Sequence, residues 1–393
     1  MKLFFRKATL LLLSAHTIMA AAIVAPGLPE IALFFSDTDG AELLSKMILS
    51  LPAIFIAISA PLAGRFIDRH GRLRLLYAGL LIYVISGTSA FYLNDLIHIL
   101  VGRIFLGISI GIIMTVTLTL IGDYFQGQGR QRFLGAQTAF IGFAGIAFLA
   151  LGGVLADLNW RYPFLIYLVP LAIIPLVMFY LEEPEIEVSK VSANRMRINP
   201  LIRLIYFTAI SFMILFYIIP TQLPFLLQKI GVQDHTVSGV VLGVNALGVV
   251  LSSLFYHRIK GSYDYSRIYA MSFLVMALSY LVAANTSSLI VILATMLFAG
   301  AGFGLIIPNT NQWLIELSPD MHRGRNLGIL HAFMFLGQFL SPLLMEPIVL
   351  WQELSSVFLL ASILLAGLAV AFAFFRSKLG KMDRVYSQML KRR

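Results

Sequence analysis

The stretch GRFIDRHGRLRLL, Gly64–Leu76, decides the fold because it sets four arginines, a histidine and an aspartate between two long apolar runs. The runs on either side are Leu43–Ala63 and Leu75–Leu93. Each has about the 20 residues that a helix needs to cross the roughly 30 Å of hydrocarbon in a bilayer. The charged stretch is therefore predicted to be the short link between two membrane spans.

The composition of the whole chain agrees with this prediction. Of its 393 residues, 59% are hydrophobic and only 12% are charged, and the mean hydropathy is +0.88. Such a chain has too little polar surface to cover a water-soluble globule of its size, so a soluble fold is excluded. We predict an all-α integral membrane protein with twelve transmembrane helices, over Ala8–Phe35, Leu43–Ala63, Leu75–Leu93, Ile97–Gly122, Phe133–Ala156, Pro163–Leu181, Leu201–Leu227, Val237–Tyr256, Ile268–Ala284, Leu289–Trp313, Leu327–Val349 and Leu354–Phe375.

The net charge of +10 is distributed in a way that orients the chain. If the N-terminus is cytoplasmic, the loops and tails on that side hold nearly all of the 29 Lys and Arg, the exceptions being Lys46, Arg103, Arg161 and Lys229. Cytoplasmic loops of membrane proteins carry such an excess of positive charge. We therefore expect both termini in the cytoplasm and no role for nucleic acid. The expected location is the cytoplasmic (inner) membrane of a bacterium.

An internal repeat divides the chain into two halves. Laid on itself with an offset of 193 residues, the sequence aligns Gly107 with Gly300 and Gly111 with Gly304. The same offset aligns RQRFLGAQTAF, from Arg130, with RGRNLGILHAF, from Arg323. Two parallel six-span halves with substrate handled between them are a transporter architecture. We predict six-helix halves over 1–181 and 201–375, a cytoplasmic linker over 182–200 and a basic cytoplasmic tail over 376–393.

Several motifs resemble the major facilitator superfamily. The charged stretch is similar to the signature loop between spans two and three of that superfamily, and the residues that carry the similarity are Gly64, Asp68, Arg69, Gly71, Arg72 and Arg74. Arg103-x-x-x-Gly107-x-x-x-Gly111 in span four is similar to its second signature. The segments PGLPEI, at 26–31, and NWRYPF, at 159–164, resemble its twelve-span drug:proton antiporter branch.

The resemblance implies that the loop gates the cytoplasmic side. Glycine at position 64 permits close helix approach and glycine at position 71 permits a turn that other residues resist, while Asp68 can cap a helix or pair with arginine. Asp123 and Glu316, which the repeat aligns, are expected to be partners for loop arginines at the cytoplasmic mouths. A plain topological anchor would explain the arginines, but neither Asp68 nor the glycine spacing.

Span five departs from the antiporter pattern. Antiporters of this family carry a Gly-Pro pair followed by Gly-Gly, whereas AGIAFLALGGVL keeps Gly152 and Gly153 but has Phe148 and Leu149 at the Gly-Pro position. Because that motif is associated with export, its loss leaves import by a proton symporter or facilitator open as an alternative.

Few ionisable residues lie inside the predicted spans, where they are costly and usually functional. At 1.5 Å per residue, Glu30 and Arg103 differ in depth by only roughly 5 Å, so we predict that they pair for proton coupling. His16 and His331, roughly 13 and 9 Å from the cytoplasmic ends of their spans, are alternative proton relays because histidine titrates near neutral pH.

The residues predicted near the midplane are mostly apolar. A cavity for sugars or organic acids needs several amides or cations at this depth, so the set favours an amphipathic substrate. The predicted cavity residues are Met19, Ser109, Met213, Phe216, Tyr217, Asn245, Phe298, Phe303 and Gln338.

Other classes of protein are less well supported by the sequence. GISIG, Gly107–Gly111, fits a nucleophile elbow, but it lies within a predicted helix, so we interpret both Gly-x-x-x-Gly pairs as helix packing rather than as a hydrolase centred on Ser109. The sequence has no Walker loop and no metal-binding motif, so no enzyme, cofactor or metal is expected. We expect a monomeric, proton-coupled exporter of small amphipathic molecules, either drugs or a secreted metabolite such as a siderophore. A non-transporting receptor or scaffold is a further alternative.

Overall fold

The computed structural model describes residues 2–184, 200–319 and 322–391, of which 68–70 and 384–391 are described by their backbone alone. Most of the predicted linker, 185–199, lies outside the described residues. The described part is almost entirely helical, and no strand occurs in it. Twelve helical segments within these ranges are long and apolar enough to cross a membrane, which confirms the twelve predicted spans.

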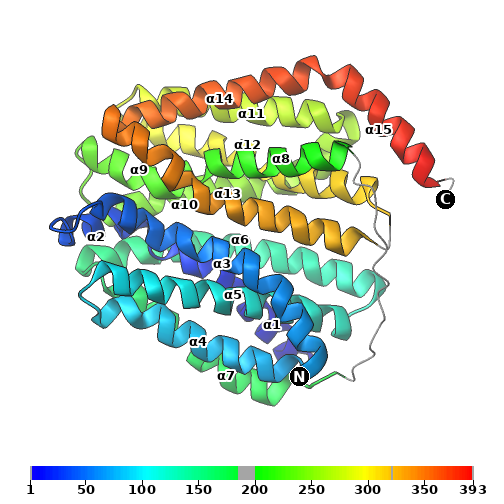
Figure 1. The fold of residues 1–393 in the computed structure, drawn as a ribbon, viewed down its shortest axis with the longest axis horizontal. Helices are drawn as coiled ribbons and strands as arrows, with labels where there is room; N and C mark the ends of the chain where they lie inside the picture. The colour runs from blue at the N-terminus through cyan, green and yellow to red at the C-terminus, as the bar shows by residue number, and fades with distance from the viewer. Residues whose placement is uncertain (1, 185–199, 320–321, 392–393) are drawn as a thin grey trace. The chain divides into compact units, whose positions relative to one another are not determined.

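The helices follow one another in the order shown in Figure 1. They are α1 (Lys2–Ala22), η1 (Ala25–Gly27), α2 (Leu28–Phe34), α3 (Ala41–His70), α4 (Arg72–Tyr92), α5 (Leu96–Tyr124), α6 (Gly127–Leu158), η2 (Tyr162–Leu168), α7 (Val169–Tyr180), α8 (Pro200–Phe216), α9 (Ile218–Lys229), α10 (His235–Ser262), α11 (Tyr265–Ala284), α12 (Leu289–Leu317), α13 (Arg323–Trp351), α14 (Leu354–Phe374) and α15 (Arg376–Lys391).

Three spans are interrupted where prolines gather. Span one is divided into α1, η1 and α2 around Pro26 and Pro29, because proline has no N–H to donate to the preceding turn. Span six opens with the 3-10 helix η2, which has Pro163 in its first turn, and continues as α7. Span seven is divided at Tyr217 into α8 and α9. Each interruption allows the outer part of the span to take a direction of its own.

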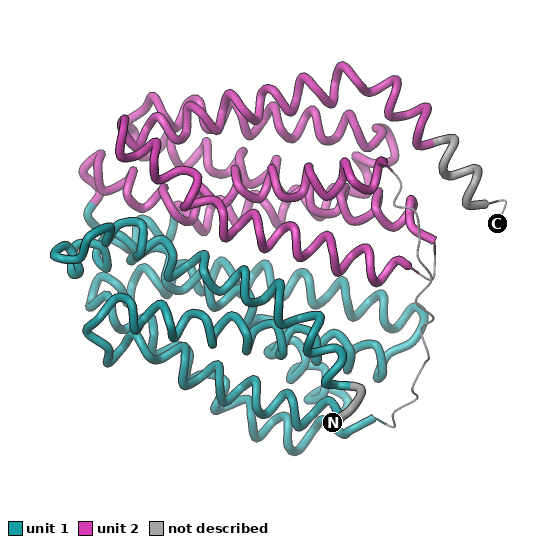
Figure 2. The backbone as a smooth tube through the Cα atoms, viewed as in Figure 1, with its two compact units in different colours: residues 1–193, 233–240 teal, residues 194–232, 241–393 magenta. Residues whose placement is uncertain are grey.

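The chain forms two compact units, coloured separately in Figure 2. Unit 1 comprises 1–193 together with 233–240, and unit 2 comprises 194–232 and 241–393. The first turns of α10 therefore pack with unit 1, although the sequence repeat places this span in the second half. This assignment of 233–240 is not foreseen by the sequence.

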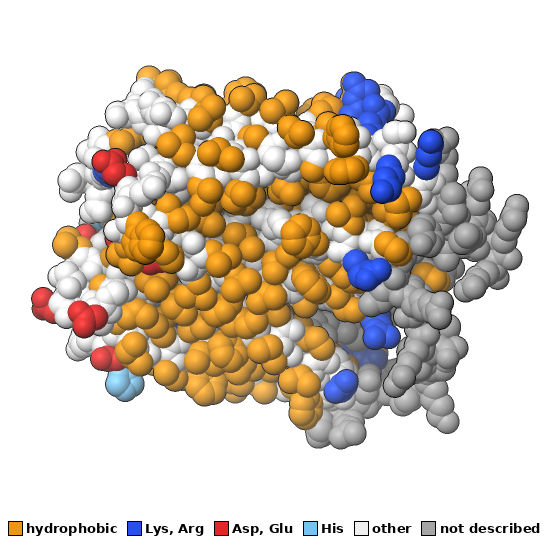
Figure 3. All heavy atoms as spheres, turned by 45° about the horizontal axis from the view of Figure 1, so that its top comes forward, with side chains coloured by type: hydrophobic (Ala, Val, Ile, Leu, Met, Phe, Trp, Pro, Cys, Tyr) orange, Lys and Arg blue, Asp and Glu red, His pale blue; other side chains and the backbone are white. Residues whose placement is uncertain are grey.

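Glycines bring helices close together within each unit. A Cβ at Gly107 of α5 would overlap the Pro52 carbonyl of α3, and one at Gly300 of α12 would overlap the Asn245 carbonyl of α10. The interpretation of the two Gly-x-x-x-Gly pairs as helix packing is thus confirmed. Figure 3 shows a broad band of hydrophobic side chains on one face, with Lys and Arg gathered at one end of the helices, here called the basic end, and Asp and Glu at the other, the acidic end.

Candidate functional site

The turn between α3 and α4 lies at the basic end of unit 1. Gly71 ends α3 and begins α4 with a φ of +86°, a conformation that side chains with a Cβ resist. A Cβ at this position would also lie 3.0 Å from a carboxylate oxygen of Glu183. The prediction that position 71 requires glycine is confirmed by both observations.

Glu183 caps the N-terminus of α4 from the far end of the unit's sequence. Its carboxylate accepts the backbone N–H groups of Arg72, at 2.6 Å, and Leu73, at 2.8 Å. The Arg72 side chain then donates from Nε to Asp123 at the end of α5, at 3.1 Å. The expected contact between a loop arginine and Asp123 is present, and a gating role for it stays a prediction.

The neighbouring Glu182 adds a second set of contacts at the same end. Its carboxylate pairs with Lys2 and Arg6 of α1, and its backbone groups hydrogen-bond the Tyr124 hydroxyl. The hydrogen bond from Lys2 and the charges of Lys2 and Arg6 hold the pKa of Glu182 below its usual value. The residues that follow α7 are thus fastened to α1, α4 and α5.

Other predicted gate residues make fewer contacts. Gly64 has open space where its Cβ would be, so the expected close helix approach at this position was wrong for the described residues. Arg74 is exposed, and Glu316 accepts a hydrogen bond from Gln312 at 3.2 Å. The side chains of Asp68 and Arg69 lie outside the part that the structure describes.

Arg103 on α5 is fully buried, with none of its surface exposed. It donates to the Tyr167 hydroxyl at 3.2 Å and to the Gly87 carbonyl at 3.1 Å. Its guanidinium lies 4.9 Å from the ring centre of Phe164 and 5.2 Å from that of Tyr167. Its Nε is buried without a hydrogen-bond partner, and no carboxylate among the described residues pairs with it.

The predicted pair of Glu30 and Arg103 is therefore wrong. Glu30 lies in the first turn of α2, beyond the break in span one, and its carboxylate is 3.9 Å from the imidazole of His235. Arg103 instead faces the aromatic side chains of η2. Similar depth did not bring the two together because the break in span one gives α2 its own direction.

His16 shares a buried network with Arg103. Its Nδ1 donates to the carbonyls of Leu12 and Leu13, which leaves Nε2 buried and without a partner. Its ring centre lies 5.1 Å from that of Tyr83, and the Tyr83 ring centre lies 5.6 Å from that of Tyr167. Tyr167 in turn accepts the hydrogen bond from Arg103. His331 on α13 differs, because it is exposed and bonds only its own helix, at Leu327.

The retained glycines of span five contact two different neighbours. A Cβ at Gly152 of α6 would overlap the Ile23 carbonyl at the break in span one. A Cβ at Gly153 would lie 2.5 Å from the His235 carbonyl, and one at Gly239 would overlap the Leu149 carbonyl. The start of α10 thus crosses α6 with its backbone in close contact, at the acidic end of unit 1.

The aromatic members of the predicted cavity set gather in unit 2. Phe216 of α8 stacks on Phe303 of α12 with ring centres 3.4 Å apart, and Phe212 meets the same ring edge-on at 5.8 Å. Met213 and Tyr217, which are next to Phe212 and Phe216 in the sequence, are also buried. Phe298 is 58% exposed and makes no ring contact among the described residues, and its place in a cavity stays a prediction. Five residues along a helix separate the two by about 140°.

Two polar members of the set already have hydrogen-bond partners. Asn245 donates to the Met296 carbonyl at 2.9 Å, and Ser109 donates to Leu106 of its own helix at 2.7 Å. Met19 is buried in α1, and Gln338 is half-buried on α13. Two polar groups predicted for the cavity are therefore already hydrogen-bonded within their own unit.

Comparison with known proteins decides the family. A model described as Major Facilitator Superfamily matches residues 10–259 and 205–385, which together cover most of the sequence. The chain belongs to the major facilitator superfamily. Arg103 and Gly71 both lie within the matched residues 10–259.

Curated relatives in this superfamily include drug-resistance proteins. The chain is 31% identical over 163 residues to the multidrug transporter protein MdtP of Bacillus subtilis, a match that covers 37% of the chain and 30% of MdtP. It is 28% identical over 160 residues to the quinolone resistance protein NorB of Staphylococcus aureus, covering 40% of the chain and 34% of NorB. The matched segments thus span about a third of the length of these relatives.

Solved structures of major facilitator fold resemble the whole chain. A D-xylose-proton symporter superposes with a TM-score of 0.77 at 17% identity, over 95% of this chain and 98% of that one. A bacterial homologue of the lysosomal transporter Spinster, inward-facing and occupied, superposes with a TM-score of 0.74 at 14% identity, over 97% and 96%. Identity at this level establishes the fold and nothing finer.

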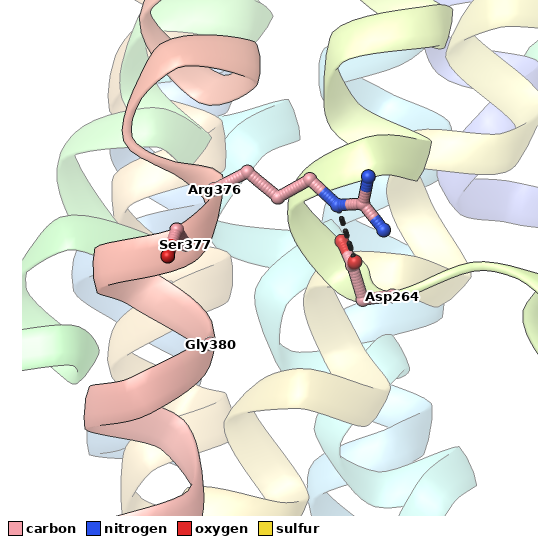
Figure 4. A pocket seen from close by; sticks show the side chains of 4 residues that line it. All are labelled: Asp264, Arg376, Ser377 and Gly380. Atoms are coloured by element: carbon pink, nitrogen blue, oxygen red, sulfur yellow. Dashed lines mark hydrogen bonds and ion pairs between the residues drawn. The ribbon is translucent and has the colours of Figure 1, made fainter.

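The basic end of unit 2 carries a cluster that the sequence did not single out. Asp264 caps α11 through the Arg267 N–H and pairs with Arg376 of α15 at 2.6 Å, as Figure 4 shows. Farther along α15, Asp383 accepts the indole N–H of Trp313 at 2.9 Å. The first part of the predicted tail is thus a helix fastened to α11 and α12 of this major facilitator protein.

Proposed function

We propose that the chain is a proton-coupled secondary transporter that exports small amphipathic molecules by alternating access. The observation that carries the proposal is Arg103, a fully buried cation in span four that has no carboxylate partner among the described residues. A charge at this depth is costly and usually functional. Tyr167 and Tyr83 connect it to His16, which supplies a titratable group whose Nε2 is free to take a proton.

The chemistry of the interior supports an amphipathic substrate. In unit 2 the rings of Phe212, Phe216 and Phe303 form an apolar surface, and the amide of Asn245 already has a partner. In unit 1 the hydroxyl of Ser109 is bonded within its own helix. Aromatic and methionine side chains adapt to substrates of different shape. The printed names of the relatives, multidrug transporter and quinolone resistance protein, agree with such a substrate.

The orientation and assembly are part of the same proposal. We place the basic end in the cytoplasm of a bacterium, in accordance with the excess of Lys and Arg there. The two halves are 1–181 and 201–375, and one chain carries both, so a monomer suffices for alternating access. The loop with Gly71 and Arg72 and the acids Asp123 and Glu316 are the gate residues of this scheme.

Flux into proteoliposomes under an imposed proton gradient tests the proposal. We expect gradient-dependent movement of lipophilic cations, or of a siderophore, and no movement of sugars. Arg103→Lys keeps the charge but loses the planar fork that serves Tyr167 and Gly87, so the gradient dependence should fall. Arg258→Lys, an exposed substitution in unit 2, is the matched control. Flux of the panel that ignores the gradient would contradict the proposal.

Import by proton symport is a second candidate, favoured by the residues of span five. Phe148 and Leu149 stand where exporters of this family carry a Gly-Pro pair. The same vesicles decide between the two directions. Accumulation on the side from which protons leave indicates exchange, whereas accumulation on the side that protons enter indicates symport.

A further inference from the structure

The first turn of α10 is held on unit 1 by an aspartate of another helix. The carboxylate of Asp157, near the end of α6, accepts the backbone N–H of His235 at 2.6 Å and that of Thr236 at 2.9 Å, and it also bonds the Thr236 hydroxyl. These N–H groups have no partner within a helix, and the positive end of the helix dipole attracts the carboxylate. The cap fixes the position of His235 relative to α6.

The His235 imidazole faces a second carboxylate. Its Nε2 lies 3.9 Å from Oε2 of Glu30, with 13% of the His235 side chain and 42% of the Glu30 side chain exposed. The charged groups about the imidazole are Glu30 on α2, Asp157 on α6 and Asp234, the residue that precedes His235 in the sequence. All three are acidic, and the Glu30 carboxylate lies within ion-pair distance of the ring.

The imidazole is placed where its charge changes the packing of a helix. The close crossing of α6 and α10, at Gly153 and Gly239, leaves no space for adjustment beneath His235. A proton on the ring attracts Glu30 and draws α2 toward α10. Without that proton, the contact at 3.9 Å is no longer an ion pair.

We propose that His235 and Glu30 form a proton-binding pair at the acidic end of unit 1, through which protons reach the transporter from outside. The step is reversible binding of one proton to Nε2 of His235, with Glu30 as counter-charge and Asp157 as the residue that positions the ring. The inference rests on the proposed proton coupling for its role in transport. Its physical core, a charge-coupled His235 and Glu30, can be tested without transport.

The chain contains its own control for this experiment. His98 pairs with Asp95 at 2.7 Å, also in unit 1 and also at the start of a helix, but both side chains are largely exposed. The N–H of His98 donates to Asp95 and holds the pKa of that carboxyl below its ordinary value. The two histidines therefore allow a comparison of one kind of pair, a histidine beside a carboxylate, at a close helix crossing and at an exposed helix start.

Modification of histidines by diethyl pyrocarbonate, followed by mass spectrometry of the peptides, measures both on the same molecules. The reagent attacks the neutral ring, so the rate against pH gives a midpoint for each histidine. In purified full-length protein we expect Glu30→Gln to lower the His235 midpoint by about half a pH unit or more and to leave that of His98 unchanged. Asp95→Asn should do the reverse. A His235 midpoint that is equal in wild type and Glu30→Gln overturns the proposal.

Transport against external pH then tests the role of the pair. Wild type and His98→Gln should share one dependence near neutral pH, and His235→Gln should lose it while Glu30→Gln shifts it to lower pH. If His235→Gln does not fold, Glu30→Gln with its exposed side chain still decides the question. If Glu30→Gln shifts the His235 midpoint but neither variant changes the pH profile of transport, the pair has no role in proton coupling. If the wild type shows no proton-driven flux at all, the proposed function is overturned instead.

Discussion

In unit 1 the turn before α4 is held by the acidic residue Glu183, which follows the sixth span. In unit 2 the turn before α11 contains the acidic residue Asp264 and is held by the basic residue Arg376, which follows the twelfth span. With the repeat offset of 193, Gly71 aligns with Asp264 and Glu183 aligns with Arg376. Equivalent positions therefore meet in both units, but by different bonds: Glu183 accepts backbone N–H groups beside Gly71, whereas Arg376 forms an ion pair with Asp264. Figure 4 shows the unit 2 version.

The difference shows which property of the contact the repeat has kept. In both units a residue that follows the last span bonds the turn between the second and third spans of that half. In unit 1 the cap of α4 comes entirely from Glu183, and Gly71 makes room for it. In unit 2 Asp264 caps its own helix, and Arg376 only adds an exposed ion pair. Unit 1 should consequently depend more strongly on this contact.

Exchanging the two turn residues should give the largest effect. Gly71→Asp places a Cβ at φ +86° and against the Glu183 carboxylate, where strain of about 1–3 kcal/mol is added to repulsion between two acids. Asp264→Gly loses a cap, for which glycine costs only a few tenths of a kcal/mol, and one exposed ion pair. Thermal unfolding of the two variants in detergent measures the difference. Equal loss of stability would show that the two turns are equivalent after all.

The second effect concerns the acids that the repeat aligns at Asp123 and Glu316. Arg72 is mostly buried, so Asp123→Asn leaves its charge without a carboxylate and should destabilise the protein by about 1–3 kcal/mol. Glu316 is exposed, and Glu316→Gln should stay within about 0.5 kcal/mol. The same unfolding measurement, together with flux, checks both. A larger loss for Glu316→Gln would contradict the ranking of the two units.

Much of the fold could be predicted from the sequence because its signals are local. Span length follows from hydrophobic runs, and the repeat follows from aligned glycines and arginines. The requirement for glycine at position 71 follows from the turn that must join two spans. The spans and the turn depend on residues that are neighbours in sequence or on the bilayer thickness, and the structure confirms them. The division into halves depends on the offset of 193 residues and stays a prediction.

The candidate site was less predictable because depth along a helix does not give direction around it. Glu30 and Arg103 have similar depth, yet one faces His235 and the other faces Tyr167. Phe298 and Phe303 differ by little more than one turn, yet only Phe303 stacks on a neighbouring ring. Side-chain packing between helices decides these directions, and neither periodicity nor spacing in a single sequence records it.

A third, smaller effect compares the two residues that follow the last spans. Glu183→Ala removes the acceptor of two N–H groups at the start of α4, so a loss of about 0.5–2 kcal/mol is expected. Arg376→Ala removes one exposed pair and should cost at most about 1 kcal/mol. Glu183→Gln, which keeps one acceptor oxygen, should fall between wild type and Glu183→Ala. If Arg376→Ala is the more damaging variant, α15 rather than the cap of α11 stabilises that end of unit 2.

The smallest effect should appear at Glu182, where the repeat aligns an acid of unit 1 with Phe375 of unit 2. Lys2 and Arg6 lower the pKa of Glu182 in the folded protein. Their stabilising contribution is therefore present above the ordinary glutamate pKa of about 4.3 and is lost as the pH falls through the lowered value. Glu182→Gln should melt slightly below wild type at pH 7, and the two should converge below about pH 4. The matched control is Glu353→Gln, which removes another exposed pair, with Lys229. The hydrogen bond from Lys229 lowers the pKa of Glu353, so the melting temperatures of this variant and of wild type should also converge in acid. A difference for Glu182→Gln that persists in acid would mean that the side chain acts by packing against Tyr124 and α1 rather than by its charge.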